Sequence, residues 1–282
     1  MWYFCNKYPQ MLVFPKAKIN VGLRITGKRT DGYHNIETIF YPVSLCDALE
    51  LVVNEQGSCK DDLALTGYNL PGNREDNLIL RAVGKLRENF SIPFLKIHLH
   101  KNIPVGAGLG GGSSDAACML RTMNRIFGLS LSNDELKVIA AGLGSDCPFF
   151  IDCQPSFASG KGEILVPVRS VLCGFYGVLL NPGILISTKE AYDDCLPAVS
   201  DTRLTDLINR PVSEWKEHIV NDFEKTIFEK HPPVRMIKQA LYDSGAVYSS
   251  MSGSGSTVYG IFAGKPAIPG KLKKYVIFSG GL

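Results

Sequence analysis

The sequence predicts an α+β fold, in which antiparallel strands and helices are interspersed along a chain of 282 residues. Strand patterns joined by an Asp-Gly turn occupy residues 11–53. Helical patterns follow between residues 76 and 142 and again between residues 188 and 244. A strand, a glycine-rich turn and a second strand are predicted at residues 246–262. This order differs from the regular strand–helix alternation of a doubly wound α/β protein.

Composition and charge place the chain among globular proteins that act on small molecules. Hydrophobic residues make up 45% of the sequence and charged residues 20%, which is typical of soluble domains. The formal net charge of +3 is not gathered into a block of Lys and Arg, so a nucleic-acid partner is not predicted. No apolar run approaches the roughly 18 residues of a membrane span, so no membrane partner is predicted either.

The cysteines and the first residues bear on the location of the protein. The eight cysteines contain no C-x-x-C pair, and we interpret them as reduced thiols of a cytoplasmic protein. The opening "MWYFCNKYPQ" lacks the charged and long apolar regions of a signal peptide. A clear strand pattern starts directly after it, and we interpret residues 1–10 as an upstream extension or a start placed too early.

The strands near the N-terminus are predicted from period-two alternation. "AKINVGLRIT", residues 17–26, alternates apolar and polar residues and predicts a half-buried strand. Lys18 and Asn20 share its polar face, about 7 Å apart. "RTDGYH" supplies an Asp-Gly turn before the strand "NIETIFYPVSL", which predicts a β-hairpin or meander. "DALELVV" adds a further strand.

The central helices are predicted from apolar spacing and from capping residues. "DNLILRAVGKLRENF", residues 76–90, has the apolar stripe of an amphipathic helix, and the alternating "FLKIHLH" follows it as a strand. "SSDAACMLRTMNRIFG", residues 113–128, is predicted to be a helix whose Ser and Asp residues cap its start. "SNDELKVIAAG" is predicted to begin with a capping box of Ser132 and Glu135.

The second half of the chain mixes short strands with a long helical region. "PSFASGKGEILVPV" predicts a pair of strands and "GFYGVLLNPG" a single strand. Residues 188–244 are predicted to be mostly helical, and their last helix starts at Pro232. "AVYSSMSGSGSTVYGIF" predicts the final strand, glycine turn and strand.

The stretch "PVGAGLGGGSSDAA", residues 104–117, contains five glycines in the seven positions 106–112. It matches G-x-G-x-x-G, but the amphipathic strand before it and the missing acidic residue after a second strand are unlike an NAD-binding fingerprint. No Lys follows the glycines, which excludes a Walker loop. Glycine lets backbone N–H groups approach an anion, and a helix N-terminus adds about half a positive charge. We predict a phosphate-binding loop, in which Ser113 and Ser114 contact phosphate or only cap the helix.

Three motifs in order resemble those of the GHMP kinases, the superfamily of galactokinase, homoserine kinase and mevalonate kinase. They are "PKAKINVGLRITGKRTDGYHNIETIF", the glycine loop and "MSGSGSTVYGIF". The resemblance covers residues 11–262 and is thin between residues 195 and 245. It implies a two-domain GHMP kinase fold with the active site between the domains. These would be a ribosomal-protein-S5-like N-terminal, ATP-binding domain over residues 1–163 and a ferredoxin-like C-terminal domain over residues 164–282.

The triple glycine, together with "DGYH" and "GSDCPFF", is similar to one branch of the superfamily. That branch phosphorylates a cytidine diphosphate-linked methylerythritol in non-mevalonate isoprenoid biosynthesis. The resemblance implies ATP-dependent phosphorylation of the 2-hydroxyl of this substrate, with Mg²⁺. A homoserine or mevalonate kinase is one alternative, and "DGYH" argues against it. A non-catalytic ligand sensor is another, and the presence of Lys18 and Asp146 argues against it.

The resemblance also implies two catalytic residues. Asp146, in "LGSDCPFF", matches the general base, although the usual G-A-D-V-P reads G-S-D-C-P here. Without the other motifs, Asp146 would be interpreted as a cap of the turn that begins at Pro148. Lys18 matches the catalytic lysine and Asn20 its companion on the strand, whereas a lone Lys on such a strand would be solvated. A cation near Asp146 would keep its carboxylate ionised.

The binding residues come from the same resemblance. Tyr33 would stack on the cytosine ring and His34 would hydrogen-bond its edge, although Tyr33 alone would pass for an ordinary hairpin aromatic. The Mg²⁺ ligands and the oligomeric state stay unassigned. The substrate residues implied are Asn20, Tyr33, His34, Thr188 and Tyr192. The ATP residues implied are Asn77, Lys101, Pro104, Val105, Gly106, Ala107, Gly108, Leu109, Gly110, Gly111, Gly112, Ser113 and Ser114.

Overall fold

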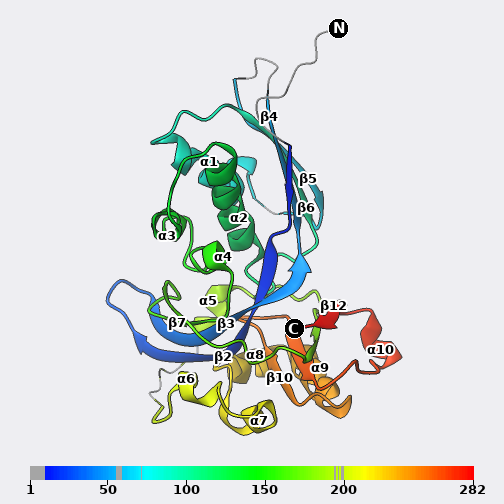
Figure 1. The fold of residues 1–282 in the computed structure, drawn as a ribbon. Coiled ribbons are helices and arrows are strands. Elements are labelled where there is room, and N and C mark those ends of the chain that lie inside the picture. The colour runs from blue at the N-terminus through cyan, green and yellow to red at the C-terminus, as the bar shows by residue number, and fades with distance from the viewer. Residues whose placement is uncertain (1–9, 55–58, 71, 194, 196, 198–199) are drawn as a thin grey trace. The chain divides into compact units, whose positions relative to one another are not determined.

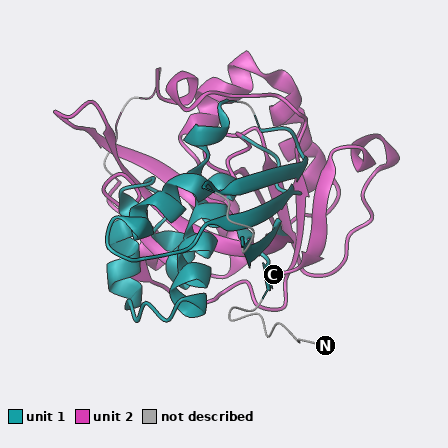
Figure 2. Ribbon diagram, turned by 90° about the horizontal axis from the view of Figure 1, so that it is seen from above, with its two compact units in different colours: residues 1–16, 46–105, 111–152 teal, residues 17–45, 106–110, 153–282 magenta. Residues whose placement is uncertain are grey.

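The computed structural model describes residues 10–54, 59–70, 72–193, 195, 197 and 200–282. The interpretation of the N-terminal extension therefore falls, up to residue 9, outside the described residues. The chain forms two compact units, coloured separately in Figure 2. Unit 1 comprises residues 1–16, 46–105 and 111–152, and unit 2 comprises residues 17–45, 106–110 and 153–282. The predicted domain boundary at residue 163 divides the chain once, whereas each of these units contains three segments of the chain. That boundary stays a prediction.

The described residues of unit 1 form one sheet and four α-helices (Figure 1). Its elements are β1 (Met11–Val13), β4 (Ala48–Val53), β5 (Asp62–Gly67), a 3-10 helix (Arg74–Asp76), α1 (Leu78–Arg87), β6 (Leu95–Lys101), α2 (Gly111–Ile126), α3 (Asn133–Ala141) and α4 (Phe149–Asp152). The strand order is β1-β4-β6-β5. Strand β4 pairs antiparallel with β1 and β6, and β5 pairs parallel with β6. Helices α1 and α2 pack against each other beside this sheet.

The predicted elements of unit 1 are confirmed where the sequence patterns are regular. Strand β6 alternates buried and exposed residues, and the apolar stripe of α1 is buried. Helix α3 has the predicted capping box of Ser132 and Glu135 and ends at Gly142. Strand β5 was not predicted, because its exposed "ALTG" end carries little strand pattern.

Unit 2 contains two further four-stranded sheets, ordered β2-β3-β7-β8 and β10-β11-β9-β12. In the second sheet all neighbours are antiparallel, and α9 packs against β10 and β11. Lys16, the first residue of β2, and Cys46, the last residue of β3, belong to unit 1. The strands are β2 (Lys16–Lys28), β3 (His34–Cys46), β7 (Ser156–Ser159), β8 (Ile164–Pro167), β9 (Tyr176–Leu180), β10 (Tyr248–Met251), β11 (Val258–Phe262) and β12 (Val276–Gly281). The α-helices are α5 (Thr188–Asp193), α6 (Leu204–Leu207), α7 (Trp215–His218), α8 (Phe223–Lys230), α9 (Pro232–Asp243) and α10 (Gly270–Lys273).

The β2–β3 turn and the C-terminal strands confirm several predictions for unit 2. The Asp-Gly turn joins β2 to β3, and the backbone N–H of Arg29 donates to the carbonyl oxygen of Tyr33 at 2.8 Å. Strands β10 and β11 flank the predicted glycine turn, and α9 starts at Pro232 as expected. Strand β12 was not predicted, because it is recognised as a strand only by its antiparallel pairing with β9.

The prediction of a half-buried strand over residues 17–26 is wrong, because β2 is buried on both faces. Its polar side chains are enclosed together with partners from other segments. Lys18 is 4% exposed and Asn20 is 2% exposed. The Arg24 guanidinium donates to the carbonyl oxygen of Thr202 at 2.6 Å. The alternating sequence pattern shows which residues of the strand are polar. Whether those side chains are buried depends on the segments that pack over them.

An apolar cluster of unit 2 lies where β2 and β3 meet the C-terminal sheet and its helices. Leu23 and Ile25 of β2, Val178 of β9 and Ile227 of α8 are each 4% exposed or less. This core fixes the segments from which unit 2 presents its polar residues. No helix in the described part of the chain has the length and apolar character that a membrane crossing requires.

Candidate active site

The part of the glycine loop that belongs to unit 2, residues 106–110, is held by two other segments. Gly108 has φ of +76°, and a Cβ atom there would lie 1.9 Å from the carbonyl oxygen of Ser252, so only glycine fits. The Ser252 hydroxyl donates to the carbonyl oxygen of Gly108 at 2.8 Å. The backbone N–H of Lys18 donates to the carbonyl oxygen of Leu109 at 3.0 Å. Segments of all three sequence motifs therefore meet within unit 2.

The C-terminal glycine turn is itself fixed by buried polar side chains. The backbone N–H of Asn20 donates to the Ser252 hydroxyl at 3.2 Å. The side-chain amide of Asn221 donates to the carbonyl oxygens of Met251 and Gly253, both at 2.8 Å. Asn221 is 2% exposed and was missed from the sequence, because a single Asn in a divergent segment carries no pattern. Its hydrogen bonds fix the turn on which the glycine loop rests.

Lys18 and Asn20 form a buried polar group on β2, as their shared face predicted. The Lys18 ammonium donates to Oδ1 of Asn20 at 2.5 Å, and the Asn20 amide donates to the Thr38 hydroxyl at 3.0 Å. The ammonium also lies 4.9 Å from the centre of the Phe40 ring. These contacts hold a buried cation in a defined position. Thr38 was not predicted, because it lies on β3 and contacts Asn20 only in the folded sheet.

Helix α2 begins at Gly111, which is two residues before the predicted start. The prediction that Ser113, Ser114 and Asp115 cap the helix is therefore wrong, because all three lie inside it. Ser114 and Asp115 are each 2% exposed. Glycine residues form the start instead, so no side chain of the first two residues covers the N–H groups there. This arrangement suits an anion.

Asp146 lies in the loop between α3 and α4 of unit 1 and is half-buried. The neighbouring Cys147 is buried, and its thiol hydrogen-bonds with Ser113 of α2. Burial raises the pKa of the Cys147 thiol to about 11, so it stays protonated at neutral pH. A Cβ atom on Gly144 would lie 3.9 Å from the Ser113 hydroxyl. The structure therefore brings the Asp146 loop close to the first turn of α2.

The residues expected to bind cytidine lie in unit 2. Tyr33 is 59% exposed, and the Lys161 ammonium lies 4.6 Å from the centre of its ring. The rings of His34 and Tyr192 stack on each other, with their centres 4.6 Å apart and an angle of 16° between them. Thr188 is the first residue of α5, which also carries Tyr192. Because His34 and Tyr192 are in direct stacking contact, a base has no room between these two rings.

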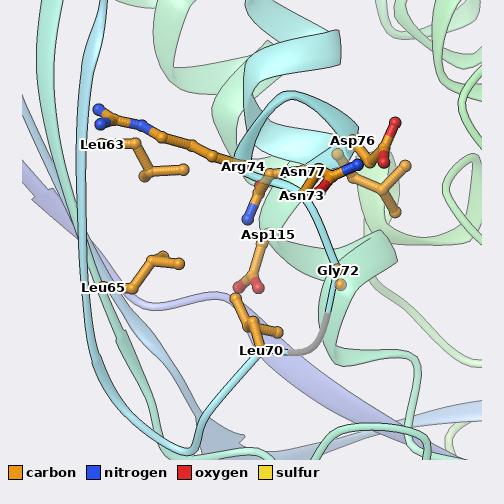
Figure 3. A pocket seen from close by; sticks show the side chains of 11 residues that line it. Leu63, Leu65, Leu70, Gly72, Asn73, Arg74, Asp76, Asn77 and Asp115 are labelled. Carbon is orange, nitrogen blue, oxygen red and sulfur yellow. The ribbon is translucent and has the colours of Figure 1, made fainter.

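A pocket of about 400 Å³ lies within unit 1 (Figure 3). Two of the residues predicted to bind ATP, Asn77 and Gly112, line it. Asn77 also caps α1, since its side chain accepts a hydrogen bond from the backbone N–H of Ile79 at 2.9 Å. The pocket was not predicted, because β5 supplies part of its apolar wall. The full lining is Leu63, Leu65, Leu70, Gly72, Asn73, Arg74, Asp76, Asn77, Leu78, Gly112 and Asp115.

Lys101, at the end of β6, belongs to a buried cluster of charged groups. Its ammonium donates to the carboxylates of Asp47 and Asp115, the second at 2.8 Å, and its side chain is 2% exposed. Asp47 also accepts hydrogen bonds from the backbone N–H groups of Asn102 and Ile103, at 2.6 and 2.8 Å. The predicted contact of Lys101 with ATP stays a prediction. The pairing of Lys101 with these two aspartates was not predicted, because Asp47 and Asp115 belong to other segments of the chain.

Within the described ranges, no three or more His, Cys, Asp or Glu side chains are grouped so that they could hold a metal ion. The charged cluster described above contains Lys101, whose ammonium would compete with a cation for the carboxylates of Asp47 and Asp115.

Comparisons with known proteins agree with the geometry. The family model of the GHMP kinases N terminal domain matches residues 77–153, and that of the GHMP kinases C terminal matches residues 204–274. A protein of Bacteroides thetaiotaomicron named 4-diphosphocytidyl-2-C-methyl-D-erythritol kinase is 49% identical over 92% of this chain and 94% of its own length. A protein of Parabacteroides distasonis with the same name is 50% identical over 89% of this chain and 92% of its own length.

Solved structures give the same result at the level of the fold. A crystal structure of 4-(cytidine 5'-diphospho)-2C-methyl-D-erythritol kinase has a TM-score of 0.75 and 29% identity, and covers 89% of this chain and 90% of that one. A homoserine kinase of Cytophaga hutchinsonii, at a TM-score of 0.61 and 17% identity over 97% of this chain and 90% of that one, shares the fold alone. With its three ordered motifs and these relatives, the chain belongs to the GHMP kinases, and within them to the 4-diphosphocytidyl-2-C-methyl-D-erythritol kinase family.

Proposed function

We propose that this chain transfers the terminal phosphoryl group of ATP to the 2-hydroxyl of 4-diphosphocytidyl-2-C-methyl-D-erythritol, in non-mevalonate isoprenoid biosynthesis. The observation that carries the proposal is the relationship to kinases of that name, at 49–50% identity over about nine-tenths of the chain. The positions of the motifs within each unit support it. Phosphoryl transfer depends mainly on positioning and electrostatics, and the buried cation and the glycine loop are suited to both.

The ATP site is proposed to comprise the glycine loop (residues 104–114), the first turn of α2 and the adjoining pocket of unit 1. The loop and the helix N-terminus would bind the phosphates through backbone N–H groups. The leucine-lined pocket, with Asn77 at its edge, would hold the base. Lys101 would contribute by fixing the chain that leads into the loop, because its ammonium is enclosed by two carboxylates. Mg²⁺ is proposed to arrive with the phosphates, since it is commonly held by them together with one or two carboxylates.

The chemical step is proposed to use Asp146 and Lys18. Asp146 would accept the proton of the substrate hydroxyl as a general base. Lys18, held by Asn20 on β2, would stabilise the negative charge that develops on the alkoxide and on the transferred phosphoryl group.

The cytidine end of the substrate is proposed to bind at Tyr33 and His34. Tyr33 exposes more than half of its surface and offers a ring for base stacking. The stack of His34 on Tyr192 fixes the plane of the imidazole, so its edge could hydrogen-bond the edge of cytosine. Tyr192 would act here through His34, and Thr188 would contribute from the start of α5.

The reaction can be tested by measuring ADP release with cytidylated methylerythritol, homoserine, mevalonate and galactose as acceptors. We expect saturable activity with the first alone. Saturable activity with homoserine or mevalonate instead would assign the chain to another kinase activity, and no ADP release with any acceptor would favour a ligand sensor. Calorimetry should detect MgATP binding and no NAD binding, because the loop lacks the context of a dinucleotide site.

The roles of Asp146 and Lys18 can be tested by substitution. Asp146→Asn keeps the shape of the side chain but cannot accept the proton, so kcat should fall by about 10²–10⁴-fold while both substrates still bind. The Lys18→Ala enzyme should also have a lower kcat than the wild type. If the two residues act as one unit, the double variant should be little worse than the poorer single variant. An Asp146→Asn enzyme that keeps more than about a tenth of the wild-type kcat, and unfolds normally by circular dichroism, would remove Asp146 from the mechanism.

The stacking role of Tyr33 can be tested in the same assay. Tyr33→Ala should weaken the binding of the cytidylated substrate by about 1–3 kcal/mol, the range for base–aromatic stacking. The affinity for ATP should stay constant, and Tyr33→Phe should bind the substrate nearly as well as the wild type because it keeps the ring. Equal weakening of both ligands, or of neither, would make Tyr33 a structural residue only.

A further inference from the structure

The segment of residues 220–223 leads into α8 and lies beside β2 in unit 2. The backbone N–H of Leu23 donates to the carbonyl oxygen of Val220 at 2.9 Å, and the backbone N–H of Asp222 donates to the carbonyl oxygen of Leu23 at 2.8 Å. The Asp222 carboxyl group also accepts from the backbone N–H of Ile25 at 2.8 Å. These hydrogen bonds fix the 220–223 segment against the strand that carries the proposed catalytic lysine.

The side-chain amide of Asn221 holds the C-terminal glycine turn from within this segment. It donates to the carbonyl oxygens of Met251 and Gly253, both at 2.8 Å. Ser252, which lies between them, contacts the glycine loop, because its hydroxyl donates to the carbonyl oxygen of Gly108 at 2.8 Å. One side chain therefore fixes the backbone on both sides of the residue on which the loop rests. Asn221 acts on the glycine loop through this turn.

Phe223, the first residue of α8, contacts the side chains expected to bind cytidine. Its ring packs edge-to-face with that of Tyr192, with the ring centres 4.8 Å apart and an angle of 81° between the planes. Tyr192 in turn stacks on His34. Phe223 is 2% exposed, and its backbone N–H donates to Oδ1 of Asn221 at 3.0 Å. A buried ring on a fixed backbone thus sets the plane of Tyr192 and, through it, the plane of the imidazole.

We propose that Asn221 and Phe223 are positioning residues for the two substrates. Asn221 shapes the glycine loop for the phosphates of ATP, acting through Ser252. Phe223 orients the rings that bind the cytidine end of the acceptor, acting through Tyr192. The inference rests on the proposed function, which assigns these two sites. Because the two side chains contact different partners, a substitution at either should weaken one ligand alone, whereas the loss of a merely structural residue would weaken both ligands or neither.

Calorimetry with MgATP and, separately, with cytidylated methylerythritol tests the role of Asn221. Asn221→Asp keeps an oxygen that accepts from the backbone N–H of Phe223, but the ionised side chain lacks the two donors to the turn. We expect the affinity for ATP to fall by about three- to tenfold, as for a lost hydrogen bond, and the affinity for the acceptor to change by less than about twofold. An unchanged affinity for ATP in this variant would overturn the role of Asn221.

Phe223→Leu should give the reverse pattern. Leucine keeps the position apolar but removes the ring contact with Tyr192. The affinity for the acceptor should fall by about two- to tenfold, the range for the loss of one aromatic pair, while the affinity for ATP stays constant. Equal weakening of both ligands in this variant and in Asn221→Asp would show that the 220–223 segment only supports the fold, and would overturn the proposal.

Two variants elsewhere in unit 2 are matched controls for a loss of stability. Ser249→Ala removes a buried hydroxyl of β10 that donates to the carbonyl oxygen of Tyr259 at 2.9 Å. Leu241→Val shortens a side chain of α9 that belongs to the same apolar cluster as Phe223. Both should lower Tm while both affinities stay within about twofold of the wild type. Controls that weaken a ligand as much as the test variants do would overturn the proposal.

A second variant covers the case in which the buried charge of Asn221→Asp prevents folding. Asn221→Ala should bind ATP about three- to tenfold more weakly than Ser249→Ala does, and equal affinities in these two variants would contradict the role of Asn221. No saturable binding of either ligand to the wild type would overturn the proposed function and this inference with it. Normal binding and turnover by the wild type, without the two separate effects, would overturn the roles of Asn221 and Phe223 alone.

Discussion

Helices α2 and α3 follow one another in unit 1, yet their first turns are built differently. At α3, the Ser132 hydroxyl accepts from the backbone N–H of Glu135 at 3.3 Å, and the Glu135 carboxylate accepts from the backbone N–H of Ser132 at 2.8 Å. This helix therefore satisfies donors at its start with its own side chains. At α2, the first turn begins with Gly111 and Gly112, which have no side chains that could do so.

The difference separates a helix start that serves stability from one that serves binding. The capping box makes α3 independent of any ligand, and α3 leads into the loop of Asp146. The glycine start of α2 costs conformational entropy, and it leaves backbone N–H groups accessible to an anion. Substitutions at the two helix starts should therefore change different properties. At α2 they should change the affinity for nucleotide, and at α3 they should change the free energy of unfolding.

The largest effect is expected in the loop before α2. Gly108→Ala would place a Cβ atom 1.9 Å from the Ser252 carbonyl oxygen at a φ of +76°. A positive φ alone costs an L-residue roughly 1–2 kcal/mol, and the overlap adds to it, so we expect a loss of about 3 kcal/mol or more in the free energy of unfolding. Urea denaturation measures it.

Gly174→Ala is the matched control for Gly108→Ala. Gly174 also has a positive φ, of +91°, but a Cβ atom there would meet nothing within 4 Å. It should therefore show the cost of the backbone conformation alone, roughly 1–2 kcal/mol. Equal losses in the two variants would mean that the close approach of the glycine loop to Ser252 contributes nothing.

An intermediate effect, on binding alone, is expected for Gly112→Ala. A Cβ atom there would lie 3.7 Å from Leu78, an ordinary contact, so the helix should fold at least as well as before. The methyl group would occupy the lining of the pocket, and KM for ATP should rise by about tenfold, or about 1.4 kcal/mol.

The helix α1 supplies the control for that variant. Gly84→Ala lies in the interior of α1, with nothing within 4 Å of the added atom, and should stabilise the protein by about 0.5–1 kcal/mol. Its KM for ATP should not change. A Gly112→Ala enzyme with an unchanged KM would show that the start of α2 is not part of the nucleotide site.

The smallest effect is expected at α3. Ser132→Ala removes the cap and should lower the free energy of unfolding by about 1 kcal/mol, with kcat and KM unchanged, whereas Ser132→Thr should keep most of the stability. Hydrogen bonds from the backbone and side chain of Ser132 lower the pKa of Glu135 below its usual 4.5. The contribution of Glu135 is therefore present above that pH and is lost as the pH falls through its lowered pKa. Thermal unfolding at pH 7 and pH 3.5 measures both effects, and a stability gap between Glu135→Gln and the wild type that widens in acid would contradict this sign.

Local patterns explain what was predictable from the sequence. The capping box of α3, the Asp-Gly turn and the strand–turn–strand of residues 246–262 each depend on neighbouring residues, and all three are confirmed. The position of Lys18 and Asn20 on the same face of β2, where they hydrogen-bond, was predictable from strand periodicity in the same way. The three motifs of the superfamily reinforced each other because they occur in order.

Contacts between distant segments explain what was missed. Asp47 and Asp115 meet Lys101 only when β4, β6 and α2 are assembled, and no spacing in the sequence marks them as a cluster. The pocket depends on β5, which is recognised as a strand only by its parallel pairing with β6. The start of α2 was misplaced because Ser113 and Ser114 look like caps, although the glycines before them already form the helix.

The hydrogen bonds that join β2 to the end of the chain also determine when unit 2 can be completed on the ribosome. The carbonyl oxygen of Asn20 accepts from the hydroxyl of Tyr259, which is 239 residues later, at 2.8 Å. At about 5–20 residues per second, this strand waits roughly 10–50 s for that partner. Among the described residues, the last strand of unit 1 ends at Lys101 and the unit itself ends at residue 152, so it can close much earlier. A nascent chain that stalls before β10 would therefore carry a finished unit 1 and a β2 whose buried faces are still uncovered, which favours aggregation.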